Sequence, residues 1–113
     1  MFLVLVVILL APQPEIRKQY LCHGVTPTGS YDVVLIIEKK EDNYLLTWIT
    51  NEIKARGIGL RVDDTLTALF VNPKNEGGVI HFKITKVGLE GSWAMGSGKV
   101  YTETCSLGPV SKA

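Results

Sequence analysis

The stretch that most constrains the fold lies between residues 66 and 93, where three alternating apolar segments are separated by turn-forming residues. It reads LTALFV, NPKNEGG, VIHFKITKV, a single glycine, and LEGSW. Alternation of apolar and polar residues is the period of a β-strand with one buried face. The loop NPKNEGG and Gly88 interrupt the alternation as turns do. Short strands joined by short turns predict an antiparallel meander.

The same pattern extends over the rest of the chain. Residues 31–38 (YDVVLIIE) form the clearest segment, because β-branched residues favour strands. Residues 42–57 (DNYLLTWITNEIKARG) also match helical spacing, but their β-branched and aromatic content favours two strands. The predicted strands cover residues 16–23, 31–38, 44–50, 53–60, 65–71, 79–87, 89–95 and 99–106, with a loop at residues 24–30.

Two cysteines, Cys22 and Cys105, lie on the first and the last predicted strands. An open sheet of eight strands would leave two unpaired edges and an exposed apolar face, and closure into an up-and-down barrel removes both. A disulfide requires Cα atoms about 4.4–6.8 Å apart, and the end strands of a meander are neighbours only if the sheet closes. We therefore predict an all-β fold, a single antiparallel up-and-down meander of about eight strands. We expect it to form a closed or nearly closed, calycin-like barrel with a Cys22–Cys105 disulfide.

The chain opens with an apolar run, FLVLVVILLA, that ends at Ala11. A helix needs about 20 apolar residues to span a bilayer, so this run is too short, but it has the length of a signal-peptide core. No Lys or Arg precedes it, which leaves an atypical or truncated signal, a buried strand or a membrane-lying tail as alternatives. Export predicts a periplasmic or secreted protein, where disulfides persist. The expected organisation is a signal-like segment at 1–11, a linker at 12–15, the barrel domain at 16–106 and a C-terminal tail at 107–113.

Length and charge narrow the class of protein. A chain of 113 residues corresponds to one domain. Its formal net charge of +1 gives no field that would steer it to nucleic acid or anionic lipid. There is no phosphate-binding loop and no basic patch interleaved with aromatic residues. We therefore predict no nucleic-acid partner and no stable membrane span.

The two histidines and two cysteines are the candidate residues for a catalytic or metal-binding site. His23 adjoins Cys22, but sequence neighbours in a strand point to opposite faces. His81 lies in the middle of a predicted strand, where an exposed histidine is the simplest interpretation. No two potential ligands have the sequence spacing of a zinc site. The acidic residues cluster at predicted turns. The sequence predicts no enzyme, no metal site and no cofactor.

The aromatic residues are the remaining candidates for a site. A small eight-stranded barrel is either filled by its own side chains or holds one small ligand. Trp48 and Trp93 therefore either fill the core or form walls of an apolar pocket. Gly57 and Gly59 share one face and leave room there for a large neighbour such as Trp48. The candidate pocket residues are Tyr31, Tyr44, Trp48, Gly57, Gly59, Phe70 and Trp93.

Short motifs along residues 20–109 follow the order seen in a known family. They are Gly29-Ser30-Tyr31, Tyr44-x-Leu46-x-Trp48, Gly57-x-Gly59-Leu60-Arg61, Asp64-x-Leu66, Gly77-Gly78-Val79, Gly88-Leu89-Glu90-Gly91-x-Trp93 and Thr102-Glu103-Thr104-Cys105. With these motifs the chain resembles a family of small exported bacterial β-proteins, mostly of unknown function and some loosely labelled fibronectin-binding. It departs from the family at Asp32-Val33 and at Asp63, where glycine is usual.

The resemblance implies a compact β-barrel-like domain in the periplasm or outside the cell, and it implies no established activity. The likeness to avidin and lipocalin barrels is one of architecture, which does not carry function. We expect an exported, non-enzymatic module that binds a small apolar ligand or an envelope partner. The alternative is a structural or interaction protein with a fully packed core and no ligand pocket.

Overall fold

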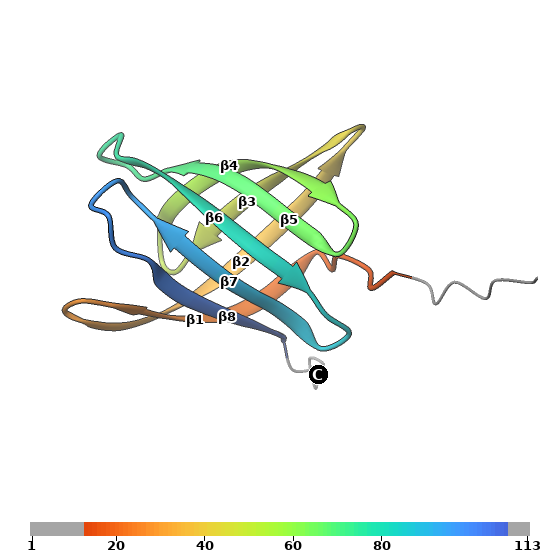
Figure 1. The fold of residues 1–113 in the computed structure, drawn as a ribbon, viewed down its shortest axis with the longest axis horizontal. Coiled ribbons are helices and arrows are strands. Elements are labelled where there is room, and N and C mark those ends of the chain that lie inside the picture. Colours follow the sequence, from red (N-terminus) through yellow and green to blue (C-terminus); the bar gives the residue numbers. More distant parts are fainter. Residues whose placement is uncertain (1–12, 109–113) are drawn as a thin grey trace, which may run out of the picture.

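The computed structural model describes residues 13–108, which form eight antiparallel strands and no helix (Figure 1). The all-β prediction is confirmed, and the helical alternative for residues 42–57 is wrong, because these residues form two strands of a hairpin. The strands are β1 (Gln19–Thr26), β2 (Gly29–Lys40), β3 (Asn43–Ile49), β4 (Ile53–Val62), β5 (Thr65–Val71), β6 (Gly77–Ile84), β7 (Gly88–Ala94) and β8 (Tyr101–Leu107).

Each strand pairs with the next one along the chain, and β1 pairs with β8, which closes the barrel. Cys22 and Cys105 face each other across the β1–β8 ladder and form the predicted disulfide. Their Cα atoms are 4.0 Å apart, below the range expected from disulfides in general. The register places the two cysteines directly opposite each other on adjacent antiparallel strands, which brings their Cα atoms close together.

The strand boundaries differ from the prediction mainly at the turns. The first strand begins at Gln19 rather than at residue 16, and it runs through the predicted loop as far as Thr26. At the β6–β7 turn, the hydroxyl oxygen of Thr85 accepts hydrogen bonds from the backbone N–H groups of Val87 and Gly88, so β6 ends before residue 85. The last strand includes Leu107, which the prediction assigned to the tail.

One end of the barrel is closed by packed side chains. It carries the β2–β3, β4–β5 and β6–β7 turns, at the right in Figure 1. Residues 13–16 lie against this end, where the Arg61 guanidinium donates a 2.7 Å hydrogen bond to the carbonyl oxygen of Pro14 and Ile16 packs against the core. The largest fully buried side chains of the interior are Tyr20, Leu35, Leu46, Leu66, Phe82, Ile84 and Leu89.

The opposite end carries the β1–β2, β3–β4, β5–β6 and β7–β8 connections, at the left in Figure 1. The interior at this end is lined by aromatic side chains rather than filled by aliphatic ones. In residues 13–108 no helix is long and apolar enough to cross a membrane. The expected signal-like segment at 1–11 and most of the expected tail fall outside the described residues.

Candidate functional site

A cavity of about 310 Å³ opens at the end of the barrel that carries the β1–β2, β3–β4, β5–β6 and β7–β8 connections. Its walls are almost entirely apolar, and its rim is polar. The side chains that form the walls are Tyr31, Trp48, Ala55, Phe70, Ile80 and Trp93. Pockets that take small molecules have this composition, with a few convergent polar groups among apolar walls.

Four aromatic rings make a continuous wall in this cavity. The Tyr31 and Trp93 ring centroids lie 6.3 Å apart at 67°, those of Trp93 and Phe70 lie 6.2 Å apart at 75°, and those of Phe70 and Trp48 lie 5.7 Å apart at 59°. These edge-to-face and tilted arrangements are the ones that aromatic quadrupoles favour. The rings come from β2, β7, β5 and β3, so the wall exists only in the closed barrel.

A carboxylate joins the two ends of the aromatic wall. The Tyr31 hydroxyl donates a hydrogen bond of 2.8 Å to Glu103 Oε1, and Trp48 Nε1 donates one of 3.0 Å to Oε2. Glu103 lines the cavity although its residue is only 2% exposed. The four rings and this carboxylate therefore form a closed circuit, which we call the aromatic cage: Tyr31, Trp93, Phe70, Trp48 and Glu103.

Burial changes the titration of both acidic groups in the cage. Loss of hydration raises the pKa of Glu103 above its ordinary value, and the hydrogen bonds from Trp48 and Tyr31 offset part of that rise. Burial, and then the negative charge of Glu103, raise the pKa of the Tyr31 hydroxyl far above its ordinary value. Tyr31 therefore stays neutral and remains a hydrogen-bond donor to Glu103.

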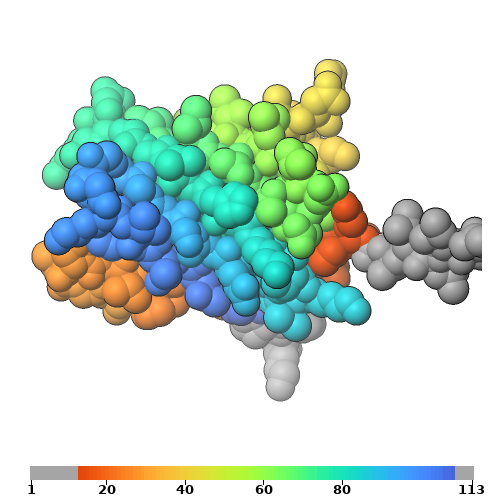
Figure 2. All heavy atoms as spheres, viewed as in Figure 1, coloured from red at the N-terminus to blue at the C-terminus, as the bar shows by residue number. Residues whose placement is uncertain are grey.

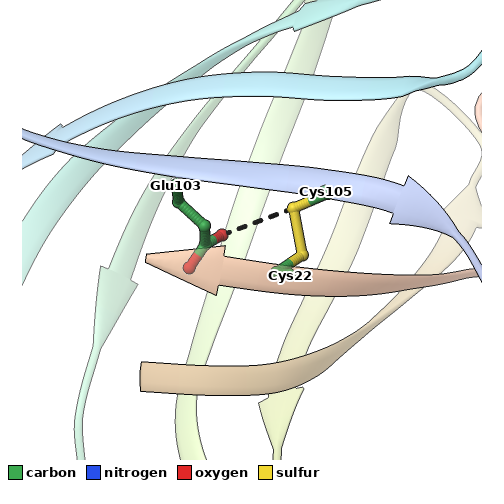
Figure 3. A group of neighbouring side chains, drawn as sticks. All are labelled: Cys22, Glu103 and Cys105. Carbon is green, nitrogen blue, oxygen red and sulfur yellow. Dashed lines mark hydrogen bonds between the residues drawn. A yellow bond between two sulfur atoms is a disulfide. The ribbon is translucent and has the colours of Figure 1, made fainter. Parts of the chain in front are cut away.

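Figure 3 shows Glu103 beside the Cys22–Cys105 disulfide on the inner side of β1 and β8. Glu103 Oε2 lies 3.7 Å from Cys105 Sγ. A disulfide sulfur has no proton, so only the protonated carboxyl can donate across this contact. The three side chains are close enough to share a metal ion, but the sulfur atoms are bonded to each other and are not free thiolates.

Interior glycines make the room that the cage rings occupy. A Cβ atom at Gly24 would lie 1.9 Å from Cζ of Tyr31, so the Tyr31 ring covers the backbone of β1 at that point. A Cβ atom at Gly78 would lie 2.5 Å from Cζ of Phe70 on the neighbouring strand. Glycines at these positions let large rings lie flat across adjacent strands.

One polar atom of the cage has no partner. The indole N–H of Trp93 is buried and makes no hydrogen bond of acceptable geometry with any described residue. Its interaction with the Tyr31 hydroxyl lowers the pKa of that group, against the larger rise caused by burial and by Glu103. A buried donor without an acceptor costs about 1–3 kcal/mol, which an acceptor atom of a bound molecule would recover.

Of the predicted pocket residues, the structure brings together Tyr31, Trp48, Phe70 and Trp93. Gly57 lies behind the wall, where a Cβ atom would be 3.3 Å from Trp48 and from Phe70. Its proximity to Trp48 agrees with the room that the sequence predicted there.

Tyr44 and Gly59 are corrections, because neither lines the cavity. Tyr44 shares the inner face with Trp48 but lies four residues away, about 13 Å along the strand, towards the closed end. A Cβ atom at Gly59 would meet the side chains of Leu66 and Leu46, which fill that half. Period-2 reasoning identifies the face of a strand but not the depth within the barrel.

The sequence reasoning did not single out Glu103 as a site residue. A signal was present, since Tyr101, Glu103 and Cys105 alternate on one face of the last strand. A carboxylate between a tyrosine and a disulfide-bonded cysteine on the inner face must be buried.

The two histidines lie on the outer face. His23 Nδ1 is 2.9 Å from Asp32 Oδ1, and His81 Nδ1 is 2.8 Å from the Thr67 hydroxyl. Both residues are exposed, as expected for His81, and neither lines the cavity.

Comparison with protein-family models, with curated proteins and with solved structures finds no match to this chain.

Proposed function

We propose that this barrel is a non-enzymatic module that binds a small, largely apolar molecule in the cavity at its open end. The observation that carries the proposal is the cavity of about 310 Å³ with four aromatic walls. Pockets for small ligands begin at about 300 Å³, which limits the ligand to a compact molecule.

The division of the interior supports the proposal. In the closed half, large aliphatic and aromatic side chains such as Leu46, Leu66 and Phe82 are fully buried. In the open half, Tyr31, Phe70 and Trp93 remain only partly buried. A solid scaffold gains stability by filling both halves, because each exposed apolar ring forfeits burial energy. An open, aromatic half is the arrangement expected of a binding site.

We also propose that the protein acts outside the cytoplasm, in the periplasm or as a secreted protein. The disulfide between β1 and β8 supports this location, since such bonds persist in oxidising compartments. The resemblance to small exported bacterial proteins is consistent with the same location and is part of the same proposal.

The two tryptophans provide the experimental test. The chain contains two Trp residues, and both line the cavity, so the intrinsic fluorescence reports on the site alone. We expect a ligand screen to find compact aromatic or alicyclic compounds that shift this fluorescence. Native mass spectrometry of protein purified from its own compartment should show a bound small molecule.

A cavity-filling variant provides the matched control. Ala55 lines the cavity, so Ala55→Leu should fill part of it and abolish binding. Ala94 follows Trp93 on β7 and points to the outer face, so Ala94→Leu should bind as the unmodified protein does. Equal binding by both variants would place the ligand elsewhere and refute the proposal.

A second candidate function is docking to another protein of the cell envelope, and a row of exposed apolar residues favours it. Leu45, Ile58, Leu69 and Val79 are successive partners across β3, β4, β5 and β6, and all four are exposed. The outer faces of β5 and β6 (green and teal) are turned toward the viewer in Figure 2.

Apolar residues that adjoin one another across four strands form a patch of the kind found at interaction surfaces. Leu69, 71% exposed, is the most exposed member of the row. The variant Leu69→Lys should abolish co-sedimentation with an envelope protein extract while leaving ligand binding in the cavity unchanged. If the variant co-sediments as before, this second function is wrong.

A further inference from the structure

The carboxylate of the aromatic cage has no positive partner within the described residues. The ion pairs found between residues 13 and 108 involve other groups, and all of those have exposed side chains. Glu103 instead accepts hydrogen bonds from two neutral donors, the Tyr31 hydroxyl and the Trp48 indole. Buried charges are ordinarily paired with an opposite charge or neutralised by a shift in pKa, so the ionised form of Glu103 has no counter-charge in the cage.

The one basic side chain that lines the cavity, among the described residues, is directed elsewhere. Lys54 lies at the rim, and its ammonium group is 3.1 Å from Glu52 Oε1. That pair is exposed to solvent. Lys54 therefore leaves the charge of Glu103 unpaired inside the cavity.

The walls of the cage are themselves suited to a cation. The faces of Trp, Tyr and Phe rings carry negative potential and attract ammonium groups within about 6 Å, more strongly when the cation is desolvated. The cage contains two Trp rings, one Tyr ring and one Phe ring around a single cavity. Aromatic ring faces and a buried carboxylate together can replace the hydration shell that a cation loses when it enters the cavity.

We infer that the cavity takes a small organic cation, a protonated amine on a compact apolar body, with the ammonium group beside Glu103 and the body against the four rings. This inference depends on the proposed ligand-binding function and names the chemical class of its ligand. The two oxygen atoms of Glu103 have lone pairs left after the bonds to Tyr31 and Trp48, so they can accept hydrogen bonds from the ammonium group. The free indole N–H of Trp93 favours ligands that also carry an acceptor atom.

A pair of probes of the same shape tests the inference. We suggest 2-phenylethylamine, which is protonated at neutral pH, and 2-phenylethanol, which is neutral and nearly isosteric. Binding is measured by the fluorescence of Trp48 and Trp93 and by calorimetry. We expect the amine to bind at least about tenfold more tightly than the alcohol.

Two variants, each of which removes one negative charge, show which carboxylate causes the preference for the amine over the alcohol. Glu103→Gln should abolish the preference for the amine over the alcohol, which is a ratio of two affinities measured on the same variant. Asp32→Asn removes a carboxylate from the rim of the same cavity and should preserve the preference. A preference that persists in Glu103→Gln, or one that is lost in Asp32→Asn, overturns the inference.

The outcomes separate this inference from the proposed function. If the alcohol binds as tightly as the amine, the cation inference is wrong while the apolar binding site stands. If neither probe binds and no other compact apolar compound shifts the tryptophan fluorescence, both fail.

A titration of the unmodified protein provides a test that does not depend on the folding of a variant. Measured from about pH 4 to pH 8, amine affinity should be higher at the alkaline end, because the ionised form of Glu103 attracts the ammonium group, while alcohol affinity stays constant. Other ionisable groups around the cavity are Tyr31 beside Glu103 and, at the rim, Asp32 and Lys54. The Cys22–Cys105 pair does not titrate. Amine affinity that is independent of pH over this range overturns the inference.

Discussion

Replacement of Glu103 by glutamine tests the electrostatic description of the barrel interior most directly. The carboxyl group is 2% exposed, and burial raises its pKa above the ordinary value near 4.5. A carboxyl group whose pKa is raised by folding binds its proton more tightly in the folded protein. The free energy of unfolding therefore falls as the pH rises from about 4.5 to the pKa of the folded state, and it is constant above that.

The magnitude follows from the two hydrogen bonds and the charge. A glutamine at position 103 can accept the Trp48 N–H with its oxygen and donate its amide to the Tyr31 oxygen, so both contacts at 2.8 and 3.0 Å have a substitute. What the variant removes is the cost of the buried charge, about 1.4 kcal/mol for each unit by which the pKa is raised. A change of 1 kcal/mol moves the Tm of a domain of this size by about 4–8 °C.

Urea unfolding of the disulfide-bonded protein, between about pH 4 and pH 8, measures the effect. We expect Glu103→Gln to match the unmodified protein at the acidic end and to be more stable at the alkaline end. Glu103→Ala should be less stable than both at every pH, because it leaves the Trp48 N–H buried without an acceptor, at about 1–3 kcal/mol. A glutamine variant that shows the same decline with pH as the unmodified protein refutes the reasoning.

Three further changes test other parts of the structure. Replacement of Cys22 and Cys105 together by alanine should lower the free energy of unfolding by about 4–5 kcal/mol, because the disulfide closes a loop with a sequence separation of 83. A loss below about 1 kcal/mol in urea unfolding would contradict this explanation, in which the disulfide stabilises the fold by lowering the entropy of the unfolded chain. Gly24→Ala should displace the Tyr31 ring and cost about 1–3 kcal/mol, whereas a Tyr31→Ala background should suppress that cost in a double-mutant cycle. Asp63 has φ of 52°, so Asp63→Gly should be more stable than Asp63→Ala by about 1 kcal/mol in thermal unfolding, and equal Tm values are evidence against strain at that turn.

The predictions from the sequence were accurate where a local pattern sets the outcome. The range predicted for β5 agrees with the structure, since Thr65–Val71 is an apolar segment with a turn at each end. The prediction for the first hairpin is less accurate, because it places Gly24 in a loop, whereas Gly24 lies within β1. Its place in β1 depends on the ring of Tyr31, which lies on the partner strand and covers it.

The candidate site was predictable only in part. Period-2 spacing put Trp48 on one face of its strand, but it put Tyr44 on the same face, and Tyr44 lies in the other half of the barrel. Phe70 was predicted from its aromatic side chain alone. The alternation of Tyr101, Glu103 and Cys105 places Glu103 on the inner face of the last strand, but it does not identify the partners that make a buried carboxylate tolerable. The donors that make its burial tolerable are Tyr31 and Trp48, 72 and 55 residues away along the chain.

The sequence by itself determined the strands, their antiparallel order and the closure of the sheet, because alternation and turn residues act over a few positions and the two cysteines lie on the end strands. Only the tertiary structure decided which half of the interior is filled and which is open, since that depends on the register between all eight strands. It also decided that four rings from four strands meet at one carboxylate. Strand pairing sets the depth of each side chain along the barrel axis, and depth is not encoded in the period of any single strand.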